Sequence, residues 1–240
     1  MDHNGNLINV FLHADLPSLQ NLCSTSRFFH EMCNDDYLWK LKTVKDFGTS
    51  HTAGSLKAWK ETYIKMWNLP NKIPIESWLN LLNQITIDDD QTKEDLIDIL
   101  SNILKAKQNI QKNLYYSDKE GSTILSDLIW LYRDVDGISL LNNIKGEIFN
   151  AYLSILDAGY DVNKDRDGGK LLILPMATLM DLDGITENVR WKFAEPLFRH
   201  GLDVNKRNIW DGFKHVDNYL EIYDEWNGVS LDFRIRSKLK

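Results

Sequence analysis

Three side chains near the N-terminus have the types that bind metal, but their number falls short of a site. Cys23, His30 and Cys33 offer two sulfur ligands and one nitrogen ligand. A structural zinc site takes four ligands, usually in closely spaced pairs. Helical periodicity also turns both cysteines toward a core. We therefore expect Cys23 and Cys33 to be reduced, buried thiols and no metal to be bound.

The segment after residue 160 resembles a calcium-binding loop without completing it. Counted from Asp161, the sixth position is Arg166, where the loop needs glycine. Counted from Asn163, the glycine falls correctly at Gly168, but the twelfth position is Leu174 and not glutamate. Because the bidentate glutamate is missing, the calcium signature fails.

The remaining motifs of catalysis or nucleotide binding do not occur in this sequence. The GGK at 168–170 is followed by Leu171, whereas a P-loop needs Ser or Thr after its lysine. No nucleophile elbow, HExxH motif or recognisable pair of catalytic carboxylates is present. We therefore expect a protein that is not an enzyme and has no cofactor.

Composition narrows the class of partner. The chain has 240 residues, a net charge of -7, 43% hydrophobic residues and 26% charged residues, which is ordinary for a folded protein. The acidic balance argues against nucleic acid or an anionic membrane as a partner. The N-terminus lacks the basic residues of a signal peptide, and the longest apolar run (171–177) is too short to span a bilayer. We expect a cytoplasmic protein in a reducing compartment.

Residues 7–47 hold apolar residues at the spacing of short helices. Leu7, Val10, Phe11 and Ala14 recur on one helical face, and Pro17 then breaks this helix. Three more short stripes follow at 19–23, 28–33 and 37–41; Ser18 is the expected cap of the first, and residues 34–36 of the last. Helices this short do not close a core by themselves, so the rest of the chain or a partner must cover them.

These pieces resemble the F-box, the adaptor-binding motif of ubiquitin-ligase substrate receptors. The matching segments are VF at 10–11, DLPSL at 15–19, LC at 22–23, SRF at 26–28 and DDYLWK at 35–40. The resemblance implies that the helices insert apolar side chains into a Skp-type adaptor, which links the chain to a cullin–RING ligase. The residues expected to contact the adaptor are Leu7, Val10, Phe11, Leu16, Pro17, Leu19, Leu22, Phe28 and Trp39.

The opening of the motif departs from the family pattern. Asp2, His3 and Gly5 stand where an F-box has leucine, proline and an acidic residue, and Ala14 replaces a leucine. We therefore expect the segment from Leu16 onward to carry most of the binding.

A repeated sequence dominates the second part of the chain. AGYDVNK at 158–164 recurs as HGLDVNK at 200–206, and each copy follows an apolar helix end. The glycine suits a left-handed helix C-cap, and the Asp and Asn suit the turn that follows. This pattern resembles the ankyrin repeat, as does GSTIL at 121–125, with a weaker copy at 103–111. Stacked units of this kind form a curved binding surface and need no catalytic pocket.

The predicted fold class is all-α: an F-box-like helical cluster followed by an ankyrin-like solenoid of helical hairpins with long inserts. The expected regions are the F-box-like motif at 1–47, a linker with a connecting helix at 48–74, the repeats at 75–226 and a tail at 227–240. Within the repeats we expect a helix at 75–85 and a second one through Leu104, then 122–132 paired with 145–157 and 172–181 with 187–199. The inserts are 133–143 and 181–188, and a last helix lies around 215–226.

The turn tips are the expected target-binding surface, through Tyr116, Arg166, Arg207 and Trp210. Half-buried packing is an equal alternative for the aromatic residues at these tips, which include Tyr115. In contrast, Trp39, Trp59 and Trp78 lie on apolar stripes and are expected in the core.

Two functions remain open. In the first, the chain is a substrate-recognition adaptor of a ubiquitin ligase, and its order of motifs resembles viral and bacterial proteins that redirect a host ligase. It would then act in the host cytoplasm or nucleus on an unknown target that is degraded or sequestered. In the second, the chain is a plain scaffold in which the repeats cover residues 7–47. Burial of Leu16, Leu19 and Leu22 by the repeats would favour the scaffold, and an exposed apolar patch would favour the adaptor. An enzyme with an unrecognised site is the least favoured reading.

Overall fold

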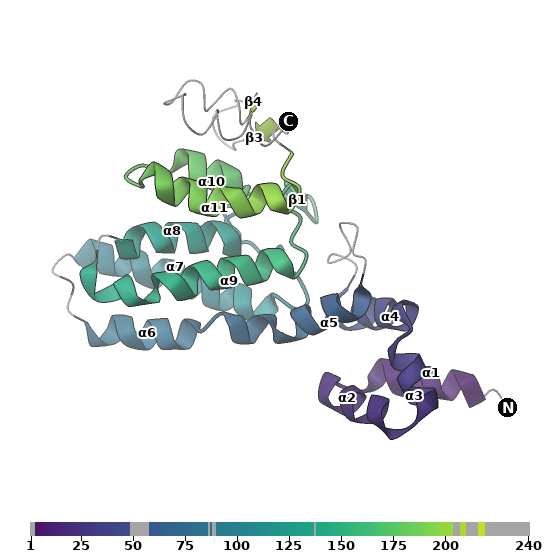
Figure 1. Cartoon of the computed structure of the whole chain (residues 1–240). Coiled ribbons are helices and arrows are strands. Elements are labelled where there is room, and N and C mark those ends of the chain that lie inside the picture. Colours follow the sequence, from purple (N-terminus) through teal and green to yellow (C-terminus); the bar gives the residue numbers. More distant parts are fainter. Residues whose placement is uncertain are drawn as a thin grey trace.

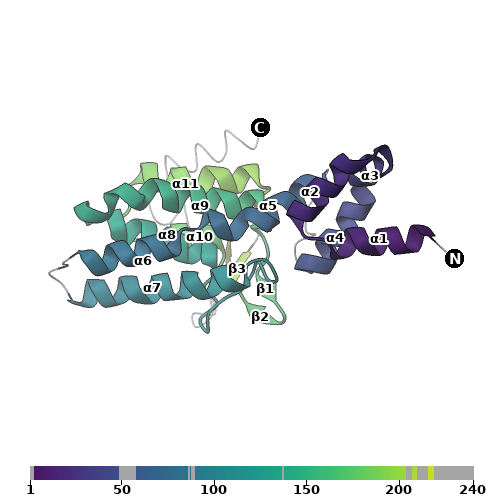
Figure 2. The ribbon, with the colours of Figure 1, turned by 90° about the horizontal axis from the view of Figure 1, so that it is seen from below.

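The structure is a computed structural model that describes residues 3–48, 58–85, 87, 90–136, 138–203, 207–209 and 216–218. A small helical cluster at the N-terminus is joined by α5 to a stack of helix pairs (Figures 1 and 2). The mainly helical prediction is confirmed. The all-α class needs one correction, because β1 (Arg166–Asp167) pairs with β2 (Lys170–Leu171), and β3 (Arg207–Ile209) pairs with β4 (Val216–Asn218).

The N-terminal cluster has four helices, α1 (His3–His13), α2 (Leu16–Thr25), α3 (Arg27–Cys33) and α4 (Asp36–Phe47). Side-chain caps begin the last three of them. The carboxylate of Asp15 accepts a hydrogen bond from the Ser18 backbone N–H at 2.8 Å. Asp15, and not Ser18 as predicted, therefore caps α2. Ser26 caps α3 in the same way, and the predicted cap of α4 is confirmed at Asp35, which accepts from the Tyr37 N–H at 2.9 Å.

Aromatic side chains close the core of this cluster, and one of them comes from α5 (Trp59–Asn68). The ring centroid of Trp39 lies 5.2 Å from that of Phe11 and 5.2 Å from that of Tyr63. The ring centroid of Phe47 lies 5.1 Å from that of Tyr63. Because α5 packs along α4, the segment expected to be a connector supplies the missing core of α1–α4.

A short 3-10 helix, η2 (Leu69–Lys72), carries the chain from α5 into the array and packs against α9. Leu69 and Ile73 are fully buried there. The side chain of Gln111 donates to the Trp67 carbonyl at 3.0 Å, and the Trp78 indole N–H donates to Glu147 at 2.7 Å. Helix α5 and the array are therefore joined by packing and by the Gln111 hydrogen bond as well as by the chain itself, whereas the bond from Trp78 connects α6 to α9 within the array.

The array consists of helix pairs in the predicted order. They are α6 (Ile75–Gln84) with α7 (Asp90–Asn109), α8 (Ile124–Asp136) with α9 (Lys145–Asp157), and α10 (Pro175–Asp181) with α11 (Glu187–Arg199). Gly159 and Gly201 end α9 and α11 with φ of 99° and 82°, which confirms both predicted glycine caps. Figure 1 shows the pairs lying one above another, with α10 and α11 furthest from α6.

Hydrogen bonds connect the turns of successive pairs. Asn163, after α9, donates to the Gly201 carbonyl at 2.8 Å, and its side-chain oxygen accepts from the Asp203 N–H at 2.8 Å. The backbone N–H of Asp161 donates to the Tyr115 hydroxyl at 2.9 Å. These bonds hold each turn against the next and so fix the relative positions of successive helix pairs.

The segment between α8 and α9 differs from the insert predicted at 133–143, whereas residues 182–186, between α10 and α11, form a loop within the insert predicted at 181–188. Helix α8 continues to Asp136, and a 3-10 helix, η3 (Ser139–Ile144), fills most of the rest of 133–143. Strand β4 occupies residues 216–218, so the helix predicted around 215–226 is wrong there. Its other residues, and residues 49–57 of the expected linker, lie outside the described residues. In the part of the chain that the structure describes, no helix has the length and apolar character needed to cross a membrane.

Candidate functional site: the N-terminal cluster and a cavity in the array

Four of the nine residues expected to contact an adaptor form the core of the cluster. Phe11, Leu16, Leu19 and Trp39 are buried. Their burial comes from the cluster and α5, because α2 packs on α3 while α1, α3 and α5 pack on α4. In the free chain these four side chains therefore lie inside the cluster, and their contact with an adaptor stays a prediction. An apolar stripe marks the residues that need covering, and here the chain covers them itself.

The other predicted contacts stay accessible to different degrees. Val10 is 50% exposed and Phe28 is 46% exposed, while Pro17 is also exposed and Leu7 and Leu22 are half-buried. Tyr37, which sequence reasoning did not select, is 62% exposed. Three of the four large apolar residues exposed in the described part of the chain (Val10, Phe28 and Tyr37, but not Ile97) therefore lie in this cluster. We call these three the exposed apolar residues of the cluster.

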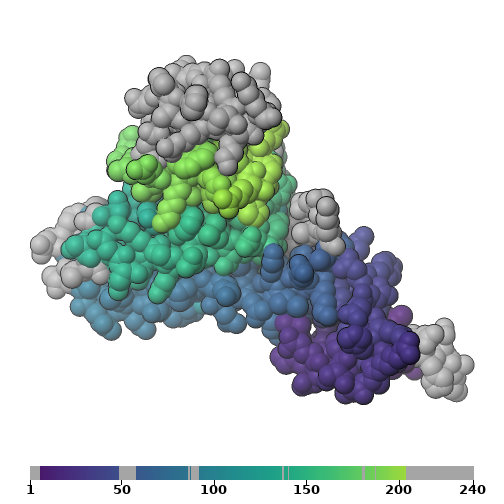
Figure 3. Space-filling model, in the orientation of Figure 1, coloured from purple at the N-terminus to yellow at the C-terminus, as the bar shows by residue number. Residues whose placement is uncertain are grey.

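The array does not cover the cluster. Figure 1 shows α1, α2 and α3 below α4 and α5, with the helix pairs to the left and above, and Figure 3 shows the cluster projecting from the rest of the molecule. The scaffold alternative required Leu16, Leu19 and Leu22 to be covered by the repeats. Leu16 and Leu19 are covered by the cluster and α5, while Leu22 is half-buried, and the surface of the cluster remains available to a partner.

A buried lysine fastens α1 to α4. Lys42 is 1% exposed, and its Nζ lies 2.9 Å from Asp46 Oδ2 and donates to the Leu12 carbonyl at 3.1 Å. The Tyr63 hydroxyl donates to the same carboxylate at 2.8 Å. Burial first, and then the bond to Asp46, raise the pKa of Tyr63 far above its ordinary value. The lysine also neutralises the negative end of the α1 dipole, so it holds the helix that carries Val10.

Replacing Lys42 with methionine is expected to lower the free energy of unfolding by about 3 kcal/mol, because Asp46 and the Leu12 carbonyl lose their buried partner. The matched control is Lys45→Met. Lys45 donates to the same carbonyl at 3.0 Å from an exposed position, so its loss should cost less than about 1 kcal/mol. Urea unfolding of the full chain measures both, and equal losses would contradict a special role for the buried lysine.

The two cysteines form a disulfide that joins α2 to α3. The Cα atoms of Cys23 and Cys33 lie 5.8 Å apart, within the usual range for such a bond. The expectation of two reduced thiols is therefore wrong. Cys33 is buried, as predicted, and its carbonyl accepts a hydrogen bond from the Trp39 indole at 2.8 Å. The bond ties the helix that carries Phe28 to the core of the cluster.

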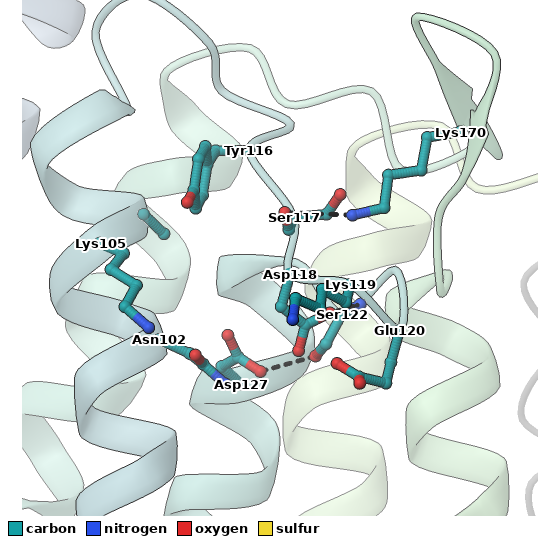
Figure 4. Close-up of a pocket in the computed structure, with 11 residues that line it drawn as sticks. Asn102, Lys105, Tyr116, Ser117, Asp118, Lys119, Glu120, Ser122, Asp127 and Lys170 are labelled. Atoms are coloured by element: carbon teal, nitrogen blue, oxygen red, sulfur yellow. Dashed lines mark hydrogen bonds between the residues drawn. The ribbon is translucent and has the colours of Figure 1, made fainter.

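A cavity of about 350 Å³ lies between α7, the turn that follows it, and the start of α8 (Figure 4). Asp127 of α8 is buried at this cavity, and burial raises its pKa to about 7. Burial also raises the pKa of Asp118. The polar lining comprises Asn102 and Lys105 from α7, Tyr116, Ser117, Asp118, Lys119, Glu120 and Ser122 from the turn, Asp127, and Lys170 from β2.

The predicted target-binding residues do not gather at one place in the described structure. Tyr116 is half-buried and lines the cavity. Arg166 is exposed on β1 and does not line it. Trp210 and the side chain of Arg207 lie outside the described residues. Tyr115 is a packing residue, with its ring centroid 4.8 Å from that of Tyr160.

The residues of the apparent calcium loop stabilise the turn after α9. Asp167 accepts hydrogen bonds from Lys164 at 2.7 Å and from Asn113 at 3.1 Å. In the described part of the chain, no three His, Cys, Asp or Glu side chains lie close enough together to hold a metal ion. Asp167 therefore has a structural role, because its hydrogen bonds connect the turn after α7 to the turn after α9.

Comparison with known proteins identifies the N-terminal cluster. The F-box-like family model matches residues 7–43, from α1 to near the end of α4. No curated protein and no solved structure matches the chain. F-box domains generally bind Skp-type adaptors, so the match indicates a part in an SCF-type ubiquitin ligase. Residues 7–43 of this chain are an F-box-like domain.

Proposed function

We propose that this chain is a substrate-recognition adaptor of an SCF-type ubiquitin ligase. The F-box-like domain docks on a Skp-type adaptor, and the helix pairs, which resemble ankyrin repeats, bind a target protein. The observation that carries the proposal is the F-box-like domain at residues 7–43, held clear of the array with Val10 and Phe28 exposed.

The energetics of the exposed apolar residues support a partner at the domain. Burying one large apolar side chain contributes about 1.5–3 kcal/mol. Val10 lies on α1 and Phe28 on α3, so a partner that covers both grips two helices that the Lys42 contacts and the disulfide hold in place. Helices that are already held in place lose little conformational entropy on binding. More of the free energy of apolar burial then contributes to affinity.

The array supports the second half of the proposal. Its turns are hydrogen-bonded in register, and repeats of this type present a continuous surface for protein partners. The chain itself performs no chemistry in this account. It raises the local concentration of the target beside the ligase, and ubiquitin transfer gains from that proximity. The proposed place of action is the cytoplasm or nucleus.

Reconstitution tests the proposal. The full chain is mixed with a purified Skp-type adaptor, a cullin and its RING subunit, and the mixture is separated by gel filtration. We expect one equimolar complex that contains all four proteins. Stable complexes have dissociation constants far below about 10 μM. A chain that elutes alone when each protein is present at about 10 μM would therefore contradict the proposal. Glutamate at Leu16 and Leu19 is unsuitable as a negative control, because both side chains are buried and the domain would unfold.

A further inference from the structure

The cavity between α7 and α8 contains a buried carboxylate that lacks a full set of partners. One oxygen of Asp127 accepts a hydrogen bond from the Ser122 hydroxyl at 2.6 Å. Among the described residues the other oxygen has no hydrogen-bond or ion-pair partner. Figure 4 shows this oxygen directed away from Ser122, into the space below Tyr116 and Lys105. Leaving a buried acceptor unsatisfied is costly, so a donor from outside the chain would stabilise it.

The charges around Asp127 indicate that this donor is a cation. Asp118 is the charged neighbour that acts on Asp127, and it further raises the pKa that burial has already raised. Lys170 is turned away, since its Nζ donates to the Ser117 carbonyl at 3.3 Å. No ion pair within the described structure joins the acids of the cavity to its lysines; the acids are Asp118, Glu120 and Asp127, and the lysines are Lys105, Lys119 and Lys170.

We propose that this cavity binds one arginine or lysine side chain of a target protein, with Asp127 pairing to the cation and Tyr116 packing against its stem. The volume of about 350 Å³ is at the lower end for ligand pockets, which suits a single side chain. A tyrosine face also attracts an ammonium or guanidinium group. The inference deepens the proposed function and rests on it, because it states what part of a target the array recognises.

Other occupants fit the same cavity less well. A calcium or zinc ion would need a cluster of ligands that the described residues do not provide. An acidic side chain would meet the three lysines at the cavity, but it would also face the unsatisfied oxygen of Asp127 and the carboxylate of Asp118. The carboxylates of Asp118 and Asp127 already repel each other, and the carboxylate of an acidic ligand would add to this repulsion. An acidic ligand therefore fits the cavity less well than a basic one.

Binding of a basic side chain should depend on pH around neutrality. Arginine stays charged throughout, whereas Asp127 ionises near pH 7. Affinity should therefore rise by about tenfold between pH 6 and pH 8, as the carboxylate forms. The charged groups that line the cavity with Asp127 are Lys105 on α7, Asp118, Lys119 and Glu120 on the turn, and Lys170 on β2, whose Nζ is bonded to the Ser117 carbonyl. On α9 the charged residues are bonded elsewhere: Lys145 to Asp136, Glu147 to Trp78, and Asp157 to His200.

Titration of the full chain with two short peptides tests the inference. The probes are acetyl-Ala-Ala-Arg-Ala-Ala-amide and the same peptide with citrulline, which has the shape of arginine without its charge, and binding is followed by NMR at pH 8. The arginine peptide should bind at least about tenfold more tightly than the citrulline peptide, and Asp127→Asn should remove this difference. Tyr116→Ala should weaken the arginine peptide by at least about threefold.

The controls separate this inference from general acidity and from the ligase proposal. Asp183→Asn removes the same charge from an exposed position between α10 and α11 and should leave peptide binding unchanged. Equal binding of the two peptides, or an unchanged preference in folded Asp127→Asn, would overturn the inference. Binding of the Skp-type adaptor is measured on the same preparations. If the adaptor binds but the preference for arginine is absent, only the cavity proposal fails. If the preference for arginine is present but the adaptor does not bind, the ligase proposal fails.

Discussion

Replacing Val10 and Phe28 together with aspartate is expected to weaken binding of a Skp-type adaptor by at least about 100-fold. Each change removes about 1.5–3 kcal/mol of apolar burial and would place a charge in a dry interface. Because both side chains are about half exposed in the free chain, the free energy of unfolding should change by less than about 1 kcal/mol. Gel filtration and calorimetric titration of the double variant, V10D with F28D, measure the loss.

A matched change elsewhere controls for this variant. Ile97 on α7 is the remaining large apolar residue that is exposed in the described part of the chain, at 38%. Ile97→Asp makes the same chemical change in the array and should leave adaptor affinity within about twofold of the original. A double variant that binds like the original chain, or an Ile97 variant that binds as poorly as the double variant, would contradict docking through the cluster.

The second large effect is expected at Gly121, in the turn before α8. Its φ is +91°, and a Cβ built there would lie 2.5 Å from the carbonyl oxygen of Leu171. The Gly121 carbonyl also accepts the Ile173 N–H at 2.9 Å, so the turn before α8 and the strand before α10 meet closely at this glycine. Gly121→Ala should lower the free energy of unfolding by about 3 kcal/mol or more, through left-handed strain plus displaced backbone.

Gly169 provides the matched control for this backbone effect. Its φ is +87°, nearly the same as that of Gly121, but a Cβ there would meet nothing within 4 Å. Gly169→Ala should therefore cost only the conformational strain, about 1–2 kcal/mol. The difference between the two variants in urea unfolding isolates the contact between neighbouring turns, and similar losses at both positions would show that this contact does not hold the stack together.

The array was the part of the fold that sequence predicted best. The helices at 75–85, 145–157 and 187–199 have long apolar periodicity, and the glycine caps at Gly159 and Gly201 mark helix ends by a backbone requirement. The short strands β1 and β4 escaped prediction because two or three residues are too few to show alternation. The pairing of turns through Asn163 depends on the distance between repeats, which no local pattern reveals.

The candidate binding surface was harder to predict, because a stripe marks apolar residues and does not reveal what covers them. Phe11 and Trp39 became core residues once Tyr63 of α5 packed against Trp39. Val10, next to Phe11 in the sequence, remained exposed. The disulfide was missed because the sequence does not reveal the distance between the Cα atoms of the two cysteines. Asp127 was missed as well, as its isolation arises from burial at a cavity that only the folded turn creates.

The most direct test of the account is the affinity of the unmodified full chain for a purified Skp-type adaptor. Calorimetric titration at neutral pH should show equimolar binding with a Kd at or below about 1 μM, the range of specific complexes that bury a few apolar anchors. Absence of binding at about 100 μM adaptor, with the chain shown to be folded in the same buffer, would contradict the proposal that its F-box-like domain recruits a ubiquitin ligase.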